Sequence, residues 1–121
     1  MKALILTDSD YKTAVYDSLY TQVIRILEQK GYSVTEREAG KSLNACIGCF
    51  GCWVKTPGEC VIKDTMAEIN RLYVNSDVVV FLSPVVFGQQ SANMKNVFDR
   101  LLPRLLPFFI RKADGWPFRL K

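Results

Sequence analysis

Residues 77–100 read Asp-Val-Val-Val-Phe-Leu-Ser-Pro-Val-Val-Phe-Gly-Gln-Gln-Ser-Ala-Asn-Met-Lys-Asn-Val-Phe-Asp-Arg. The run Val78–Leu82 is apolar throughout, which is typical of a parallel strand covered on both faces. Ser91 precedes apolar residues at helical spacing, so we expect it to cap a helix over residues 91–102. Pro103 disturbs or ends that helix. A buried strand, a loop and a helix in this order form one unit of an α/β fold.

The first 38 residues predict a second unit of the same kind. Residues 3–6 form a short apolar run, which predicts a buried strand. Residues 12–30 predict a helix, and Gly31 stands where helices often end on a left-handed glycine. Residues 32–38 alternate apolar and polar side chains, as an edge strand does. The helical residues expected to share one apolar face are Val15, Leu19, Val23, Ile26 and Leu27.

Thr65 and Glu68 have the spacing of a capping box, which predicts a further helix ending near Asn75. The chain therefore predicts a doubly wound α/β fold with a parallel sheet. Right-handed crossovers place its strands in the order 2-1-3. Ligands of such sheets bind beyond the C-terminal ends of the strands. We expect the loops that follow the three strands to meet there, with a cysteine-bearing loop (40–63) near residues 83–88.

Four cysteines, Cys46, Cys49, Cys52 and Cys60, form a C-x2-C-x2-C-x7-C pattern. Clustered cysteines in a cytosolic chain indicate metal or redox chemistry more than a disulfide framework. Three thiolates at this spacing, with a fourth after a turn, suit an iron–sulfur cubane. Two alternatives stay open: thiols that pack or undergo redox chemistry without a metal, and a zinc site.

Two other loops have the composition of ligand-binding segments. Residues 83–91 leave a buried strand with proline, glycine and an aromatic residue, so their backbone N–H groups could meet a planar heterocycle. Residues 7–13 lie between a strand and a helix N-terminus, which is the place of a phosphate site. Asp8 or Asp10 could instead cap that helix. Neither a dinucleotide fingerprint nor a P-loop motif is present in the sequence.

Composition limits the remaining possibilities. The chain has 121 residues, 49% of them apolar and 23% charged, which predicts a single domain over residues 1–121. It contains no histidine, which excludes Ser-His-Asp triads and histidine general bases within this sequence. No apolar run reaches the roughly 20 residues of a membrane span, and we expect a cytoplasmic protein. Residues 95–121 carry a net charge of +5, which we assign to a solvated helix face because no nucleic-acid motif accompanies it.

Two blocks of the sequence resemble one family. Cys46-x2-Cys49-x2-Cys52-Trp53 followed by residues 56–64 is similar to the cysteine loop of flavodoxin-like iron–sulfur flavoproteins. These belong to the NAD(P)H-dependent FMN reductase group. Residues 77–84 and 91–100 resemble the third strand and the following helix of that group. The resemblance covers about residues 1–102 and implies a flavodoxin-like fold.

The resemblance implies an FMN-dependent oxidoreductase or electron-transfer flavoprotein, with NAD(P)H or a protein as electron donor. The four cysteines are then candidate ligands of a [4Fe-4S] cluster. The residues that would contact FMN are Ser9 and Thr13 at the phosphate, and Ser83, Pro84, Val85, Val86, Phe87 and Gly88 at the isoalloxazine ring. The alternative is a cofactor-free thiol-redox or metal-binding module that acts as an oligomer.

By this resemblance the sequence stops about where the family's fourth strand would start, so we expect either a fragment or a short form completed by another chain. Order 2-1-3 leaves Val78–Leu82 at an edge, and an apolar edge without charge or proline favours pairing with another chain. The tail 103–121 is apolar enough to cover this edge. We therefore expect a homo-oligomer with an interface of roughly 1,000 Å² or more.

Overall fold

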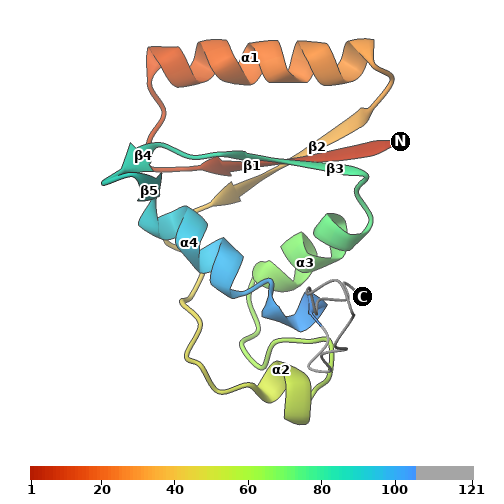
Figure 1. Ribbon diagram of the computed structural model, residues 1–121, viewed down its shortest axis with the longest axis vertical. Helices are drawn as coiled ribbons and strands as arrows, with labels where there is room; N and C mark the ends of the chain where they lie inside the picture. Colours follow the sequence, from red (N-terminus) through yellow and green to blue (C-terminus); the bar gives the residue numbers. More distant parts are fainter. Residues whose placement is uncertain (106–121) are drawn as a thin grey trace, which may run out of the picture.

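The computed structural model describes residues 1–105, and Figure 1 shows them as a sheet with helices on both faces. The sheet contains β1 (Lys2–Asp8), β2 (Ser33–Ala39) and β3 (Val78–Leu82). A separate hairpin is made by β4 (Val85–Val86) and β5 (Gln89–Gln90). The helices are α1 (Ala14–Gln29), α2 (Gly51–Val54), α3 (Met66–Val74) and α4 (Ala92–Asp99), followed by the 3-10 turn η1 (Leu102–Arg104).

The sheet has the order β2-β1-β3, and both pairings are parallel, which confirms the predicted topology. β1 runs beside β2 from Lys2 opposite Ser33 to Asp8 opposite Ala39. Its other edge pairs with the whole of β3. All three strands therefore end at the same side of the molecule, where the β4–β5 hairpin also lies (Figure 1).

Two apolar layers enclose the sheet. On one face, Leu4 and Leu6 of β1 are fully buried with Met66, Met94 and Val97 from α3 and α4. On the other face, Ala3 and Ile5 pack with Leu27 and its neighbours on α1. Successive residues of β3 also alternate between these two layers, as predicted for a strand covered on both faces.

The predicted inner face of α1 was partly wrong. Val15, Leu19 and Ile26 are exposed, while Val23 packs on the sheet and Leu27 is buried. Tyr20 and Ile24 supply the remaining contacts to that layer. The spacing 20, 23, 24 and 27 also fits a helical face, so helical period alone did not select the stripe that meets the sheet. Gly31 follows α1 with φ +82°, as predicted for a left-handed helix end.

Two predicted helix starts need correction. The Thr65 side chain makes no capping hydrogen bond, and Glu68 instead accepts from Arg37. Asp64 does the capping, because its Oδ1 accepts from the Met66 N–H at 3.1 Å. At α1, the cap is Thr13 rather than Asp8 or Asp10. In both cases another polar residue near the predicted one accepts the capping bond, and at α1 the two aspartates accept from Ser91 and Asn93 instead.

Ser91 caps α4 as predicted, since its Oγ accepts from the Met94 N–H at 3.4 Å. The helix is shorter than expected and ends at Asp99 instead of residue 102. The chain then tightens into η1, which has Pro103 in its first turn. Proline lacks an N–H donor, so it cannot continue the α-helical hydrogen bonding there. The remainder of the tail, residues 106–121, lies outside the described residues.

Replacing Ser91 with alanine is expected to lower the free energy of unfolding by about 1–2 kcal/mol, because the cap is lost. The buried Asp8 carboxylate also loses a hydrogen-bond donor. Urea unfolding measures the change, with Ser18→Ala on the exposed face of α1 as control. Equal stability of the two variants would contradict the capping role.

Candidate functional site

The loop after β1 and the start of α4 are joined by the Asp8 carboxylate. Asp8 is fully buried and accepts hydrogen bonds from Ser91 Oγ, from Asn93 Nδ2 at 3.0 Å and from the Asp10 N–H at 3.0 Å. Asn93 Nδ2 also contacts Asp10 Oδ2 at 2.9 Å. The Asp8 charge is therefore turned toward α4 and satisfied there. Two segments more than 80 residues apart in the sequence are held at one edge of the sheet.

The predicted heterocycle loop is more ordered than expected, because residues 85–90 form a hairpin. Its tip is Phe87-Gly88, and both residues have positive φ, 49° and 76°. This is the backbone of a two-residue hairpin turn, although such turns favour Asn-Gly or Asp-Gly. Phe87 is fully exposed, and neither tip N–H has a backbone acceptor within residues 1–105. The tip therefore offers an aromatic side chain and two free donors.

Ser83 holds the hairpin in place and does not point to an open site. Its Oγ donates to the Pro84 carbonyl at 3.0 Å and accepts from the Ser91 N–H at 3.0 Å. Both contacts lie at the root of the hairpin. Val85 is exposed beside the tip. Of residues 83–88, which were expected to face the ring, Ser83 therefore anchors the hairpin to the start of α4, whereas Val85 and Phe87 are accessible to solvent.

In the loop before α1, the backbone N–H of Ser9 and the hydroxyl of Thr13, the two residues expected at the phosphate, already have hydrogen-bond partners within the protein. The Ser9 N–H donates to the Ala39 carbonyl at 3.1 Å, and the Thr13 hydroxyl accepts from Tyr16 N–H at 3.3 Å. The Thr13 hydroxyl can still donate its own proton. Lys12, the one cation of residues 7–13, forms an ion pair with Glu38.

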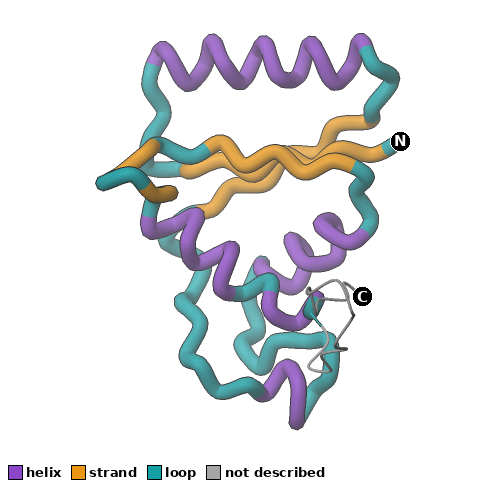
Figure 2. Tube along the Cα trace, viewed as in Figure 1, coloured by secondary structure: helices purple, strands orange, loops and turns teal. Residues whose placement is uncertain are grey.

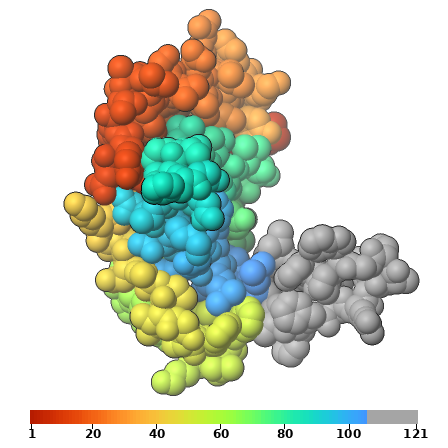
Figure 3. Space-filling view, turned by 60° about the vertical axis from the view of Figure 1, so that its left-hand side comes forward, coloured from red at the N-terminus to blue at the C-terminus, as the bar shows by residue number. Residues whose placement is uncertain are grey.

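The cysteine loop does not lie near residues 83–88, so that prediction was wrong. It leaves β2 and extends away from the sheet, as Figures 2 and 3 show. Trp53 Nε1 donates to the carbonyls of Leu102 and Leu105, at 3.3 and 3.1 Å, which docks α2 beside η1. The cysteine loop is thus at the C-terminal end of α4 and the hairpin is at its N-terminal end. Eight residues of helix, about 12 Å, separate them.

All four cysteines line one small hollow, together with Arg100 and apolar residues of the loop. Cys46 and Cys49 are exposed, Cys52 is buried and Cys60 is intermediate. The N–H groups of the two intervening glycines point at sulfur: Gly48 to Cys46 Sγ at 3.5 Å and Gly51 to Cys49 Sγ at 3.4 Å. Backbone donors to sulfur are among the features that tune protein-bound iron–sulfur clusters.

The hollow measures about 20 Å³, which is room for about one water molecule. Within residues 1–105, no three His, Cys, Asp or Glu side chains are placed to hold a single metal ion. Burial, together with the nearby thiols of Cys60, Cys46 and Cys49, raises the pKa of Cys52. The donor set suits a cluster, but loading with iron and sulfide must widen the loop, as expected when metal binding is coupled to folding.

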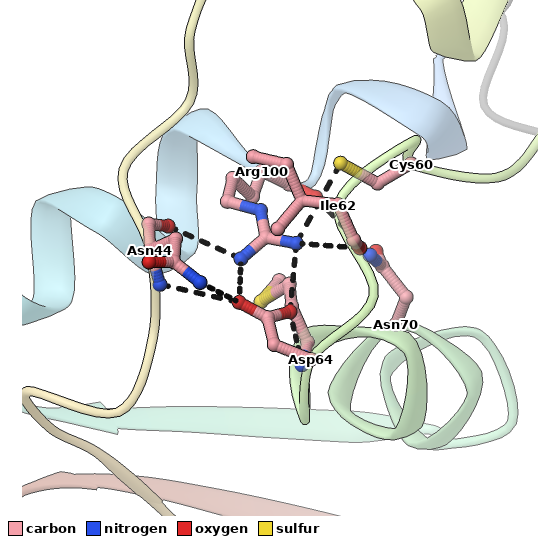
Figure 4. A network of polar contacts seen from close by, with 7 residues as sticks. Asn44, Cys60, Ile62, Asp64, Asn70 and Arg100 are labelled. Carbon is pink, nitrogen blue, oxygen red and sulfur yellow. Dashed lines mark hydrogen bonds and ion pairs between the residues drawn. The ribbon is translucent and has the colours of Figure 1, made fainter.

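Arg100, which lines this hollow, forms a buried ion pair with Asp64, and Figure 4 shows the contacts around it. The Arg100 side chain is 1% exposed and forms a two-pronged contact with Asp64, with one prong at 2.8 Å. The second N–H of Nη1 donates to the Asn44 carbonyl at 3.1 Å, and the second N–H of Nη2 is shared between the Ile62 carbonyl at 3.3 Å and Cys60 Sγ at 3.5 Å. One guanidinium therefore contacts both ends of the cysteine loop.

Hydrogen bonds decide the charge state of this pair. Burial opposes ionisation of Asp64, but donors from Arg100, Asn44 and Met66 outweigh it and hold the pKa of Asp64 below its usual value. Burial likewise opposes the charge on Arg100, while hydrogen bonds to Asp64 and Cys60 raise the pKa of Arg100. Both groups are charged at neutral pH.

Comparison with known proteins shows the family to which the chain belongs. A profile of the NADPH-dependent FMN reductases matches residues 1–115. The chain belongs to the NADPH-dependent FMN reductase family. An iron–sulfur flavoprotein of Archaeoglobus fulgidus is 36% identical over 104 residues, which is 85% of this chain and 46% of the relative. One from Methanocaldococcus jannaschii is 40% identical over 77 residues, 64% of this chain and 39% of the relative.

A solved structure from Klebsiella pneumoniae, of a protein assigned as a quinone reductase, superposes with a TM-score of 0.68 at 18% identity. The match covers 97% of this chain and 52% of that structure, and it confirms the flavodoxin-like fold. The chain thus spans about half the length, or less, of these two relatives and of this structure. No helix in the described part of the chain is long and apolar enough to cross a membrane.

Asp64 and Arg100 were given no role by the sequence analysis, although a signal was present. Arg100 stands three residues after Val97 and six after Met94, on the apolar face of a predicted helix. A charge at such a position requires a buried partner. Which acid would supply it was not visible, because Asp64 lies 36 residues away.

Replacing Asp64 with asparagine is expected to lower the free energy of unfolding by about 3 kcal/mol or more, because Arg100 keeps a buried and uncompensated charge. Glu38→Gln is the matched control, since it breaks the exposed pair with Lys12 and should change stability little. Urea unfolding at neutral pH gives both values. Equal losses would show that the buried pair is not a major source of stability.

The same pair predicts an acid sensitivity. The pKa of Asp64 is lower in the folded than in the unfolded chain, so its contribution is complete above the unfolded value of about 3.9 and is lost as pH falls through the lowered folded value. As the pH falls below about 4, wild-type stability should therefore decrease more steeply than that of Asp64→Asn. Parallel pH profiles of the two proteins would contradict this assignment.

Proposed function

We propose that this chain is the flavin- and cluster-bearing part of an FMN-dependent oxidoreductase that takes electrons from NAD(P)H or a protein donor. The observation that carries the proposal is the pairing of Asp8 with Ser91 and Asn93. It joins the loop before α1 to the root of the β4–β5 hairpin at the edge where doubly wound folds bind ligands. Membership of the NADPH-dependent FMN reductases supports the choice of flavin.

FMN would be held by two groups of residues. Ser9, Thr13 and the first N–H groups of α1 would face the phosphate, where a helix N-terminus favours an anion. The hairpin tip would face the ring, with Phe87 against it and the free N–H groups of Phe87 and Gly88 as donors. The Asp8 carboxylate accepts from Ser91 and Asn93 at the start of α4, so it is directed away from the first turn of α1. Bound FMN supplies hydride and single-electron transfer, and the chain supplies position and burial.

The four cysteines would bind a [4Fe-4S] cluster. Three features support this: the thiols share one hollow, two of the sulfurs accept backbone N–H bonds, and the related proteins carry the name iron–sulfur flavoprotein. A bound cluster supplies one-electron exchange. The second candidate, a thiol-redox module without cofactor, is favoured by the exposure of Cys46 and Cys49. Free thiols of this kind persist in the cytoplasm, which we propose as the compartment.

Two variants should separate the two cofactor sites. Cys49→Ser is expected to lose iron and its absorbance but to keep FMN, because the thiol lies at the far end of α4 from the hairpin. Phe87→Ala is expected to weaken FMN binding and to keep iron, because it removes only the exposed ring at the tip. Flavin-fluorescence titration and iron analysis after anaerobic reconstitution measure both. Val74→Ala, an exposed residue of α3, is the control for both.

Absence of flavin binding by the wild-type chain would contradict the FMN proposal for this chain. Flavin binding without uptake of iron or sulfide would leave the cysteines as thiols only. Loss of both cofactors in either variant would indicate that the variant damaged the fold, which circular dichroism checks independently.

We further propose that the chain works as a homo-oligomer. In the described residues β3 pairs with β1 alone, and its five apolar residues are all partly accessible. The exposed residues Val85 and Phe87 belong to the hairpin that follows β3 in the chain. An apolar edge of this kind favours pairing with a second chain. Light scattering over a dilution series should give the mass of at least two chains, and a one-chain mass at micromolar concentration would contradict it.

A further inference from the structure

The cysteine loop is fastened at its two ends by a single side chain. Arg100 Nη1 contacts the Asn44 carbonyl, two residues before the first cysteine. Arg100 Nη2 contacts the Ile62 carbonyl and Cys60 Sγ, at the end of the loop. The segment between these points includes the exposed Cys46 and Cys49. The loop is therefore open in its middle and fixed where its last thiol lies.

We propose that Arg100 is a positioning residue of the cysteine site, which holds Cys60 in place as the preset ligand and donates an N–H···S hydrogen bond to it. This inference rests on the proposed iron–sulfur function. Loading would then require movement of residues 46–52, while the fourth sulfur keeps its place. Second-layer partners of this kind orient ligands and strengthen metal binding.

A role confined to stability would not require this geometry. Asp64 alone would compensate the charge of Arg100, and a two-pronged contact uses one N–H of each terminal nitrogen. The second N–H of Nη1 is aimed at the Asn44 carbonyl, and the second N–H of Nη2 is shared between the Ile62 carbonyl and Cys60 Sγ. Asp64 in turn receives the Asn44 N–H at 3.1 Å and caps α3 through Met66. The pair therefore ties the thiol to the two helices that cover one face of the sheet.

Lysine at position 100 tests the inference, because it keeps the positive charge for Asp64 but lacks the planar fork that reaches several acceptors. Asn70→Ala is the matched control. Asn70 is buried and donates to the Arg100 carbonyl at 3.1 Å, so its removal weakens the same contact between α3 and α4 without touching the guanidinium. Both variants and wild type are reconstituted anaerobically with iron and sulfide.

Three readouts are compared. Cluster loss to a chelator should be about 10-fold to 100-fold faster in Arg100→Lys than in Asn70→Ala, the usual effect of removing a second-layer partner. The reduction potential should fall in Arg100→Lys alone, because a hydrogen bond to sulfur stabilises the reduced cluster. One-electron oxidation by ferricyanide should release one Fe²⁺ from a four-iron cluster whose fourth ligand is loose, leaving a three-iron cluster that electron paramagnetic resonance detects.

Equal chelator resistance and equal potential in the two variants, with wild type loading normally, would overturn the role of Arg100 and leave the proposed cluster standing. Failure of wild type to take up iron and sulfide would contradict the proposed cluster function and the inference with it. Hydrogen exchange of residues 59–64 in the iron-free proteins then shows separately whether Arg100 holds this segment. If Arg100→Lys does not fold, Asp64→Glu keeps the pair, displaces the guanidinium from Cys60 and serves for the same readouts.

Discussion

The buried charge of Arg100 is the constraint on which the packing of α3, α4 and the cysteine loop against one another depends. A guanidinium with 1% exposure needs an anion and several acceptors, and its surroundings supply them from three separate segments. Asp64 provides the anion and also the cap of α3. The carbonyls of Asn44 and Ile62 provide further acceptors and come from the two ends of the cysteine loop. The start of α3, the end of α4 and the loop are thus positioned by one interaction.

α4 carries this constraint at one end and a second one at the other. Ser91, at its start, caps the helix. Its N–H donates to Ser83 Oγ, and its hydroxyl donates to the buried Asp8 carboxylate. Arg100 follows its last turn and faces the thiols. The helix between them is rigidly packed through Met94 and Val97, which are fully buried. The β4–β5 hairpin and the cysteine loop therefore lie at opposite ends of one short helix.

Sequence reasoning succeeded where a local pattern has one physical meaning. The run Val78–Leu82 has no polar face, so burial on both sides follows, and right-handed crossovers then leave one strand order. Sequence reasoning failed where two sets of residues fit the same pattern, such as two possible caps of one helix or two apolar stripes along it. Thr65 and Asp64 are both good caps, and Asp64, which also pairs with Arg100, is the one that accepts from the Met66 N–H. The inner stripe of α1 was misjudged because two apolar stripes have the same helical period.

The sequence by itself determined the cap at Ser91 and the grouping of the four cysteines, because each depends on residues close together in the chain, and it determined the sheet topology because right-handed crossovers leave one strand order. Only the tertiary structure decided where the cysteine loop lies and what stands behind it. Contacts such as Cys60 with Arg100 or Asp8 with Ser91 join residues 40 and 83 positions apart. The periodicity and spacing of residues do not predict such pairs. A buried polar group needs a hydrogen-bond partner, but only the packing of the folded chain decides which residue becomes that partner.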